Sequence, residues 1–260
     1  MKWMTQMSIS MIDLIQGECV EEMSKLDESS IDLTVTSPPY SDIRDYNGFS
    51  WDCKRTADEL FRVTKDGGVV VWVIGDKVRN GSEEMQPFTQ AFTFRDAGFR
   101  LHDTMIYQKN AMPFPEQTRY IQCFEYMFIF SKGKPKTANM IQEPTRAKSG
   151  KPTQRNKDGS RTPLKYAKDK ATRNKWNVWK YEVGYNKHTT DKFAYEHPAM
   201  FPEKLASDHI ISWSNEGDTV LDCFMGANTT GKMAKQLNRD FIGIELDQEY
   251  FKIAQQRVDT

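Results

Sequence analysis

Short apolar runs recur along the chain, and they are rich in β-branched and aromatic residues. Seven of these runs predict strands, at residues 9–15, 31–35, 69–74, 104–107, 125–130, 219–222 and 241–245. Segments of helix length separate most of them, at residues 18–26, 55–64, 86–97, 203–213, 229–237 and 248–258. Strands that alternate with helices indicate an α/β fold with an open, largely parallel sheet and helices on both faces. The runs at 104–107 and 125–130 have no helix between them, so we expect an antiparallel hairpin at one edge of the sheet.

Length and composition bound the class of protein. A chain of 260 residues fits one large domain, or one domain that carries an insertion. No apolar run approaches the roughly 20 residues needed to span a bilayer, and the first residues do not form a signal peptide. We therefore expect a soluble, cytoplasmic protein with no membrane partner. The four cysteines lie far apart without a C-x-x-C pair, which argues against a disulfide framework and against a bound metal.

Charge is unevenly distributed along the chain. The 36 basic and 36 acidic residues cancel over the whole sequence, but residues 131–195 contain 17 Lys or Arg and five Asp or Glu, a local balance of +12. This stretch is rich in Gly, Pro, Thr and Asn and has no long apolar period, so it predicts a loop-rich basic insertion between residues 1–130 and 196–260. Its cations suit a nucleic-acid backbone, although a solvated linker would have the same composition. Rings that suit stacking on exposed bases lie between the cations, at Tyr166, Trp176, Trp179, Tyr181 and Tyr185.

A turn around residue 226 follows one predicted strand and begins a helix. The strand ends in Asp222, the turn spans residues 224–231, and the strand after the helix ends in Glu245. Glu245 lies 19 positions after Gly226, close to the spacing at which a carboxylate meets ribose hydroxyls in a βαβ unit. The last glycine of the turn is not followed by the Lys-Ser or Lys-Thr pair of a P-loop, which argues against phosphate binding. The turn is therefore a candidate nucleoside site, unless it serves packing alone.

This turn resembles the signature of a known family. Residues 222–231 read D-C-F-M-G-A-N-T-T-G, similar to the D-P-F-x-G-S-G-T-T motif of S-adenosylmethionine-dependent DNA amino-methyltransferases. The resemblance implies S-adenosylmethionine as the cofactor, with contacts from Asp222, Phe224, Gly226, Asn228, Thr229 and Glu245. Cys223 replaces the usual proline, and Ala227 and Asn228 replace Ser-Gly. Asparagine tolerates a positive φ better than most residues, so the turn can form, but we expect a weakened affinity for the cofactor.

A second loop, after the predicted strand 31–35, has the residues to act on an amine. Two consecutive prolines hold Ser37 and Pro38 out of the helical region, so that backbone carbonyls and the serine hydroxyl can point at a ligand. Methyl transfer to an exocyclic amine is difficult because the nitrogen lone pair is delocalised into the ring. Acceptors aimed at the two amine hydrogens localise that pair, and the Ser37 hydroxyl and the Pro38 carbonyl are suited to this. Tyr40 offers a ring face to a flipped base. A loop that merely ends a strand is the alternative.

The segment S-P-P-Y resembles the (D/N/S)-P-P-(Y/F/W) catalytic motif of the same family. The resemblance implies that Ser37, Pro38, Pro39 and Tyr40 are the catalytic residues. The order of catalytic loop, basic insertion and glycine turn is the circularly permuted arrangement of the β-class enzymes, which implies a Rossmann-like methyltransferase fold with a mostly parallel, seven-stranded sheet. In agreement, the strand at 241–245 lacks a following third strand, while the strand at 9–15 opens the chain without a partner. We expect these two ends to meet in the sheet.

Two shorter matches extend the resemblance. G-E-C at residues 17–19 is similar to the G-D-C motif, which implies that Glu18 lies near the cofactor adenine; a carboxylate in the first turn of a helix is the alternative. H-P-A-M-F-P at residues 197–202 is similar to the H-P-x-x-F/K-P segment, which implies that Phe201 contacts the methionine end of the cofactor. We interpret His197 as a capping or packing residue.

The target amine follows from the resemblance alone. Serine at the first motif position is associated in this family with cytosine N4 and aspartate with adenine N6, so Ser37 predicts a cytosine-N4 enzyme, with adenine N6 as the alternative. C5 methylation needs a cysteine nucleophile, typically after a proline, and none of the cysteines follows one. An RNA or protein target, or a degenerate DNA-binding module without activity, would also be compatible with these motifs.

Double-stranded DNA is the expected partner, because the target base must be extruded from a duplex. We assign residues 131–195 to target recognition. Candidate DNA contacts are Arg44, Tyr46, Arg146, Lys148, Arg155, Arg161 and Arg173. Site-specific methylation of this kind implies a restriction-modification system, with a cognate restriction endonuclease and a homodimer as open alternatives.

Overall fold

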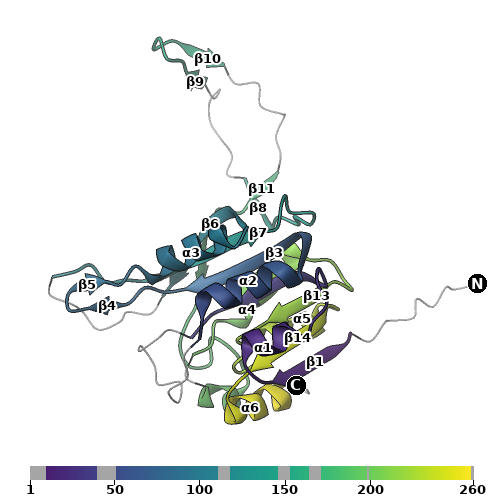
Figure 1. The fold of residues 1–260 in the computed structure, drawn as a ribbon. Helices are drawn as coiled ribbons and strands as arrows, with labels where there is room; N and C mark the ends of the chain where they lie inside the picture. Colours follow the sequence, from purple (N-terminus) through teal and green to yellow (C-terminus); the bar gives the residue numbers. More distant parts are fainter. Residues whose placement is uncertain are drawn as a thin grey trace, which may run out of the picture. The chain divides into compact units, whose positions relative to one another are not determined.

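The computed structural model describes residues 10–39, 51–110, 118–145, 153–163, 171–197 and 199–258. The chain divides into two compact units (Figure 1). The larger comprises Met1–Asn139 and Asn177–Thr260, and the smaller comprises Met140–Trp176. Five of the predicted site residues lie outside the described residues, namely Tyr40, Arg44, Tyr46, Arg146 and Lys148.

The larger unit is built on an eight-stranded sheet with the order β1-β14-β13-β2-β3-β7-β6-β12. Strand β7 is antiparallel to β3 and β6, and the other pairings in this sheet are parallel. The strands are β1 (Ile12–Gln16), β2 (Ile31–Thr36), β3 (Thr64–Ile74), β6 (Arg100–Lys109), β7 (Phe124–Ser131), β12 (Val178–Tyr181), β13 (Thr219–Asp222) and β14 (Asp240–Glu245). A two-stranded hairpin, β4 (Val78–Arg79) with β5 (Ser82–Glu83), stands apart from this sheet.

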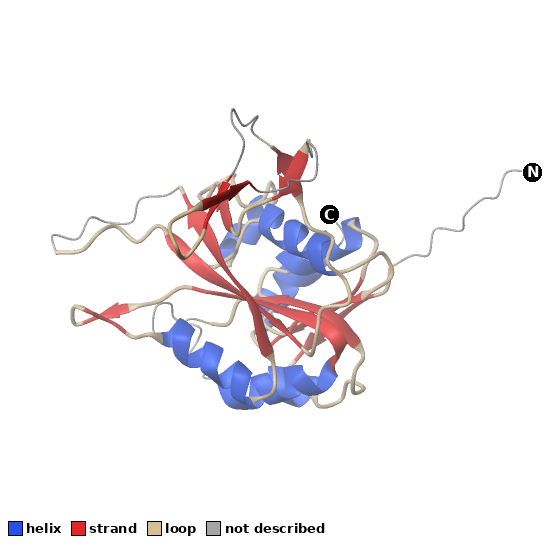
Figure 2. Cartoon of the chain, turned by 90° about the horizontal axis from the view of Figure 1, so that it is seen from above, coloured by secondary structure: helices blue, strands red, loops and turns tan. Residues whose placement is uncertain are grey.

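Helices cover both faces of the sheet (Figure 2). Contacts between neighbouring helices join α1, α2 and α3 in one layer and α4, α5 and α6 in the other. They are α1 (Cys19–Met23), α2 (Cys53–Val63), α3 (Gln86–Asp96), α4 (Glu203–Trp213), α5 (Thr229–Gln236) and α6 (Gln248–Val258), and a 3₁₀ helix, η1, spans Lys192–Glu196. Each corresponds to a predicted helix except η1. Among the described residues, no helix has both the length and the apolar character that crossing a bilayer requires.

Helix α2 illustrates why these segments fold as they do. The Asp52 side chain accepts hydrogen bonds from the backbone N–H groups of Lys54 and Arg55, which caps the start of the helix. Leu60 and Val63 lie one turn apart on its buried face, beneath the sheet. The core that they join centres on Trp72 of β3, whose ring lies 4.6 Å from that of Phe94. Strand β3 is buried on both faces, as a central strand of a mainly parallel sheet must be.

The predicted topology is largely confirmed. Strands β6 and β7 form the expected antiparallel pair. Strand β1 pairs in parallel with β14, from Ile12 opposite Phe241 to Gln16 opposite Glu245, so the two ends of the permuted sheet do meet.

The edge beside β6 differs from the prediction. Strand β12 pairs in parallel with β6, so the sheet has eight strands instead of seven and the hairpin is not at its edge. Along β12 every second residue points inward, and Trp179 and Tyr181 are only 5% and 6% exposed. The expectation that these two rings stack on exposed bases is therefore wrong, since burial leaves them no free face. Trp176 and Tyr185 are exposed, and Tyr166 lies outside the described residues.

The smaller unit lies inside the predicted insertion of 131–195, whereas β12 and η1 from that range belong to the larger unit. Its described residues form two antiparallel strand pairs. These pair β8 (Gln142–Pro144) with β11 (Thr172–Asn174) and β9 (Thr153–Arg155) with β10 (Arg161–Pro163). Only β9 with β10 is a hairpin of consecutive strands. Residues 140–176 include 11 Lys or Arg and three Asp or Glu, so the unit retains most of the predicted positive charge.

Candidate cofactor and substrate site

A cavity of about 470 Å³ opens in the larger unit, within the ~300–1,000 Å³ typical of ligand pockets. Residues that directly follow β1, β2, β13 and β14 line it. The carboxyl ends of parallel strands meet at one edge of a sheet, and ligands bind there in open α/β sheets. The proline elbow and the glycine turn, 189 positions apart from Ser37 to Gly226, therefore open into the same cavity.

Glu245 fixes the glycine turn from beneath. Its side chain accepts hydrogen bonds from the backbone N–H groups of Gly226 (2.8 Å) and Asp247 (2.9 Å), one on each carboxylate oxygen. Burial raises the pKa of Glu245, although these two hydrogen bonds oppose that effect. Each oxygen keeps further acceptor capacity, because a carboxylate oxygen has two lone pairs. This arrangement is suited to a ligand with neighbouring hydroxyl groups.

Asn228 adopts the left-handed conformation, with φ of 60°, that the family motif assigns to glycine. Its side chain is fully buried and does not line the cavity; Nδ2 donates to the carbonyl of Ala254 on α6, at 3.2 Å. The predicted contact between Asn228 and the cofactor is thus not supported by its position, and the residue shapes the turn from behind. A Cβ atom at Gly231 would lie 2.0 Å from Asn228 Oδ1, which accounts for the glycine three positions later.

Asp222 joins the two loops. Its carboxylate accepts hydrogen bonds from the hydroxyls of Thr36 (2.6 Å), at the end of β2, and Thr230 (2.7 Å), in α5. Thr230 Oγ1 also lies 3.1 Å from the carbonyl oxygen of Val35, so the strand before the elbow and the helix after the turn share a buried polar cluster. Burial raises the pKa of Asp222 to about 6, against the hydrogen bonds that lower it. The cluster holds the elbow and the turn in one relative position.

Trp51 supports the proline elbow and was not predicted from the sequence. Its indole N–H donates to the carbonyl of Pro39 at 3.2 Å. The ring lies edge-on to Phe224 of the glycine turn, with 5.3 Å between centroids, and also contacts Trp72. Ser37, Pro38 and Pro39 line the cavity as expected. Only the tertiary fold brings Trp51 back to the elbow, and no local pattern marks it.

Another wall of the cavity carries Tyr107, Lys109 and Glu125, from β6 and β7. Lys109 forms an ion pair with Glu125. Burial and the nearby Glu125 raise the pKa of Tyr107, so its phenol is neutral. These three residues were not predicted from the sequence. The end of β6 could have indicated them, because ligands bind where parallel strands end.

The segment after η1 lines another side of the cavity. Phe201 and Met200 line the cavity, as does His197. The Nδ1 atom of His197 accepts from the backbone N–H of Ala199 at 3.2 Å, and its ring packs against Tyr250 with 4.4 Å between centroids. The interpretation of His197 as a packing residue is confirmed.

Glu18 is a carboxylate at the start of a helix, as the alternative interpretation has it, and its contact with the cofactor adenine stays a prediction. It is the N-cap of α1, where its side chain accepts from the backbone N–H of Glu21 at 2.8 Å, and it also lines the cavity. Phe224, Gly226 and Thr229 line the cavity as well.

The walls have the chemistry that S-adenosylmethionine requires. Acidic side chains outnumber basic ones, and the one lysine on the described walls, Lys109, is paired with Glu125. The remaining carboxylates favour a cationic sulfonium over an anionic ligand. Burial raises the pKa of the Cys223 thiol well above its ordinary value, so Cys223 adds a small, neutral surface beside Phe224. The residues present therefore fit this cofactor.

The predicted DNA contacts that the structure describes belong to the smaller unit. Arg155 and Arg161 lie directly opposite each other across the β9–β10 hairpin, and both are exposed. Arg173 forms an ion pair with Glu143 at 2.8 Å and lies over the ring of Trp176.

Comparisons with known proteins identify the family. The family model described as DNA methylase, for N6 and N4 methyltransferases, matches residues 31–256. The orphan methyltransferase M.BamHII of Bacillus amyloliquefaciens is 52% identical over 239 residues, which cover 89% of this chain and 89% of that relative. The DNA adenine methyltransferase YhdJ of Escherichia coli K12 is 27% identical over 250 residues, covering 95% of this chain and 82% of the relative.

A solved structure shows the same fold. A protein of Thermus thermophilus described as a DNA modification methylase, in complex with S-adenosyl-L-methionine, matches with a TM-score of 0.61 and 26% identity over 95% of this chain and 94% of its own. The chain therefore belongs to the N4/N6 family of S-adenosylmethionine-dependent DNA amino-methyltransferases and has a Rossmann-like α/β fold.

Proposed function

We propose that this DNA methyltransferase transfers a methyl group from S-adenosylmethionine to the exocyclic N4 of a cytosine that is flipped out of double-stranded DNA. The observation that carries the proposal is the common cavity of the Ser37–Pro38–Pro39 elbow and the Gly226 turn. Methyl transfer requires donor and acceptor to lie within contact of each other. The Asp222 cluster supports this, because it ties both loops to one buried carboxylate.

The glycine turn and its neighbours form the cofactor end. Glu245 binds the ribose hydroxyls, Glu18 lies toward the adenine, and Phe201 lies toward the methionine part. Phe224, the first residue of the turn, packs edge-on against Trp51 and so joins this end to the elbow. When bound, S-adenosylmethionine supplies an electrophilic methyl group.

The proline elbow forms the chemical end. Ser37 Oγ and the Pro38 carbonyl accept hydrogen bonds from the two hydrogens of the target amine, which localises the lone pair on nitrogen. The same two oxygens stabilise the positive charge that develops on the nitrogen as the methyl group arrives. Trp51 binds the carbonyl of Pro39 and thereby fixes the elbow in the orientation that this requires. Tyr40 stacks on the flipped base.

The choice of cytosine as the target depends on Ser37, because serine at the first position of the catalytic motif is associated in this family with cytosine N4. Adenine N6 is the alternative, and the 27% identical relative from Escherichia coli is named an adenine methyltransferase. Both amines are conjugated to a ring with an adjacent acceptor, so the elbow chemistry serves either base. The neutral phenol of Tyr107 and the Lys109–Glu125 pair lie on the wall that remains for the base.

The smaller unit supplies DNA contacts in this proposal. Like charges directly opposite each other on a hairpin destabilise it, and the Arg155–Arg161 pair is of this kind. A phosphate bound between the two guanidinium groups would relieve the repulsion. Arg173, on β11, contacts a DNA base by hydrogen bonding or by stacking. Further predicted DNA contacts are Arg44, Tyr46, Arg146 and Lys148. A homodimer and a cognate restriction endonuclease also stay predictions; the 52% identical relative is named an orphan methyltransferase.

The test combines product identification with two matched variants. DNA incubated with the protein and isotopically labelled S-adenosylmethionine is digested to nucleosides and analysed by mass spectrometry. We expect labelled N4-methylcytosine; labelled N6-methyladenine would establish the alternative, and DNA retention without label would indicate a binding module. Ser37→Ala should reduce methyl transfer by about 100-fold or more while the cofactor dissociation constant stays within about twofold. Glu245→Gln should instead raise that dissociation constant. Unchanged turnover in Ser37→Ala would contradict the proposed role of Ser37.

A further inference from the structure

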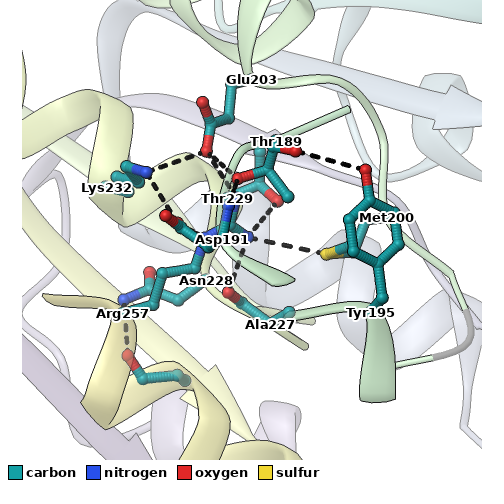
Figure 3. Close-up of polar contacts among 11 residues, drawn as sticks. Thr189, Asp191, Tyr195, Met200, Glu203, Ala227, Asn228, Thr229, Lys232 and Arg257 are labelled. Atoms are coloured by element: carbon teal, nitrogen blue, oxygen red, sulfur yellow. Dashed lines mark hydrogen bonds and ion pairs between the residues drawn. The ribbon is translucent and has the colours of Figure 1, made fainter. Parts of the chain in front are cut away.

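Behind the cofactor turn lies a cluster of four charged side chains, of which Lys232 and Arg257 are buried and Asp191 and Glu203 are partly exposed (Figure 3). Lys232 of α5 and Arg257 of α6 meet Asp191 and Glu203, which flank the segment that contains η1. The distances are 2.6 Å from Lys232 to Asp191 and 2.7 Å from Arg257 to Glu203. Two positive and two negative groups balance, as a buried ionic cluster requires. Burial acts to raise the pKa of Asp191, but hydrogen bonds from Lys232 and Arg257 prevail and hold that pKa below its ordinary value.

Arg257 also bonds to the cofactor turn itself. Its Nη1 donates to the carbonyl of Ala227 and to the hydroxyl of Thr229, each at 2.9 Å. Its Nε and Nη2 donate to Asp191 and Glu203. The side chain is fully buried, and it does not line the cavity. One planar guanidinium group therefore joins the turn to the residues at the two ends of the neighbouring segment 191–203.

The two parts of the chain that this connection joins both contribute residues to the cavity wall. The turn contributes Gly226 and Ala227 to one wall, and the segment between Asp191 and Glu203 contributes Met200 and Phe201 to another. Helix α6 is bonded to the turn a second time, because Asn228 Nδ2 donates to the carbonyl of Ala254. The position at which Asn228 replaces the family's glycine is thus held by the same helix that carries Arg257.

We propose that Arg257 is a positioning residue for cofactor binding, which holds the Ala227–Thr229 turn and the Met200–Phe201 wall at the separation that S-adenosylmethionine requires. The proposal rests on the proposed function, since it assumes the cofactor in this cavity. Lysine could not replace arginine here, because a single ammonium group cannot reach four acceptors arranged as a planar fork. Without Arg257, the Ala227 carbonyl loses a charged donor and the two walls lose their common partner.

The test compares two buried arginines. Arg257→Met removes the connection, whereas Arg239→Met removes a buried arginine that donates to Ser214 (2.8 Å to its carbonyl) and to Leu237, away from the turn. Isothermal titration calorimetry with S-adenosylmethionine should give a dissociation constant raised about tenfold or more for Arg257→Met and less than about twofold for Arg239→Met. Tenfold corresponds to about 1.4 kcal/mol. At saturating cofactor, kcat of Arg257→Met should return to near that of the wild-type enzyme, while its KM for the cofactor stays raised.

A folding defect would obscure this comparison, because Arg257→Met leaves Asp191 and Glu203 with one cation. The double variant Arg257→Met with Glu203→Gln keeps the cluster neutral, and Glu203→Gln alone keeps Arg257 on the turn. We expect weakened cofactor binding in the double variant and nearly unchanged binding in Glu203→Gln, with thermal unfolding measured without ligand for each variant.

Three outcomes would overturn the proposal. Folded Arg257→Met that binds S-adenosylmethionine as tightly as the wild type shows that the connection is unimportant. If Arg257→Met and Arg239→Met weaken cofactor binding equally, and in proportion to their loss of stability, the role of Arg257 is merely structural. A lowered kcat at saturating cofactor, with KM for the cofactor unchanged, places Arg257 in another step. Failure of the wild-type chain to bind S-adenosylmethionine contradicts the proposed function instead, before any variant is compared.

Discussion

At the scale of single residues, Asp222 has both a structural and an electrostatic effect. Three donors hold its carboxylate, namely the Thr36 and Thr230 hydroxyls and the backbone N–H of Phe224. Burial nevertheless prevails and raises its pKa from 3.8 to about 6. At neutral pH the group is therefore ionised in a place where water cannot solvate it, and the burial of this charge reduces the stability of the fold, although the hydrogen bonds offset part of that effect.

This gives a pH dependence with a defined sign. Between about pH 4 and pH 6 the folded chain keeps a proton on Asp222 that the unfolded chain releases, so this residue's contribution to the free energy of unfolding falls as pH rises, and it levels off above pH 6. The loss across this window should approach about 3 kcal/mol, and Asp222→Asn should abolish it. Urea unfolding of both proteins at several values of pH measures the difference. Exposed Asp58→Asn is the control, and parallel pH curves for Asp222→Asn and wild type would refute the assignment.

Motifs with a fixed backbone geometry were predictable at this scale. Ser37, Gly226, Glu245 and Phe201 line one cavity as expected, because each ends a strand, directly follows one or lies within a recognisable loop. The role of Trp51 was not predictable, since its bond to Pro39 depends on how residues 51 and 39 approach in the tertiary fold.

The Lys109–Glu125 pair and the direction of the Asn228 side chain were also not predictable, because both depend on the tertiary fold. Lys109 and Glu125 meet only because β6 and β7 pair in a particular register, with Tyr107 opposite Glu125. Asn228 was expected to contact the cofactor, but its side-chain amide donates to Ala254 of α6, 26 positions later in the chain. A sequence motif specifies the conformation of the turn, whereas the direction of the side chain depends on what packs behind it.

At the scale of elements, the β9–β10 hairpin is the clearest candidate for contact with phosphate. Its strands are exposed throughout, and Arg155 faces Arg161. Few apolar contacts stabilise such a hairpin, so its two cations can be changed without disturbing a core.

We expect Arg155→Gln combined with Arg161→Gln to weaken binding to DNA of any sequence. The slope of log affinity against log salt concentration should become shallower by about two, one for each lost phosphate contact. Fluorescence anisotropy across a salt series provides the measurement. Arg95→Gln, an exposed arginine of α3 that pairs with Asp96, is the matched control. A slope equal to that of the wild type in the double variant would exclude these two residues as phosphate contacts.

Strand β12 shows where composition misleads. Its sequence V-W-K-Y alternates outward and inward residues. The strand has only four residues, however, and it lies within a strongly basic stretch. The period-2 pattern needs more residues than this to be distinguished from a loop. Tyr181 makes the inward position unmistakable in the structure, because its hydroxyl donates to the buried Asp208 at 2.9 Å.

At the scale of the whole molecule, the two units divide the proposed tasks. All residues that line the cavity belong to the larger unit, and the β9–β10 hairpin belongs to the smaller one. The alternation of strands and helices was sufficient to predict the larger unit, whereas the described part of the smaller one has short, mostly exposed strands whose pairing no apolar pattern reveals in advance.

Replacing residues 140–176 with a flexible Gly-Ser linker should therefore separate these tasks. We expect the shortened protein to bind S-adenosylmethionine within about twofold of the full chain, because no lining residue is removed. Its retention of DNA should fall to the level of a non-binding protein. Calorimetry and gel-shift assays report the two properties. Loss of cofactor binding in a folded shortened protein would show that the smaller unit contributes to the cavity.

The pairing of β1 with β14 also has a consequence for how the protein is made. Ile12 opposes Phe241, 229 positions later, so β1 has no partner while most of the chain is still being translated. At roughly 5–20 residues per second, the ribosome needs about 10–45 s to cover that interval. During this time β1 presents an open strand edge, and chaperones or slow, late assembly must protect it from pairing with the wrong chain. The pairing of β1 with β14 thus delays completion of the sheet until β14 has been synthesised.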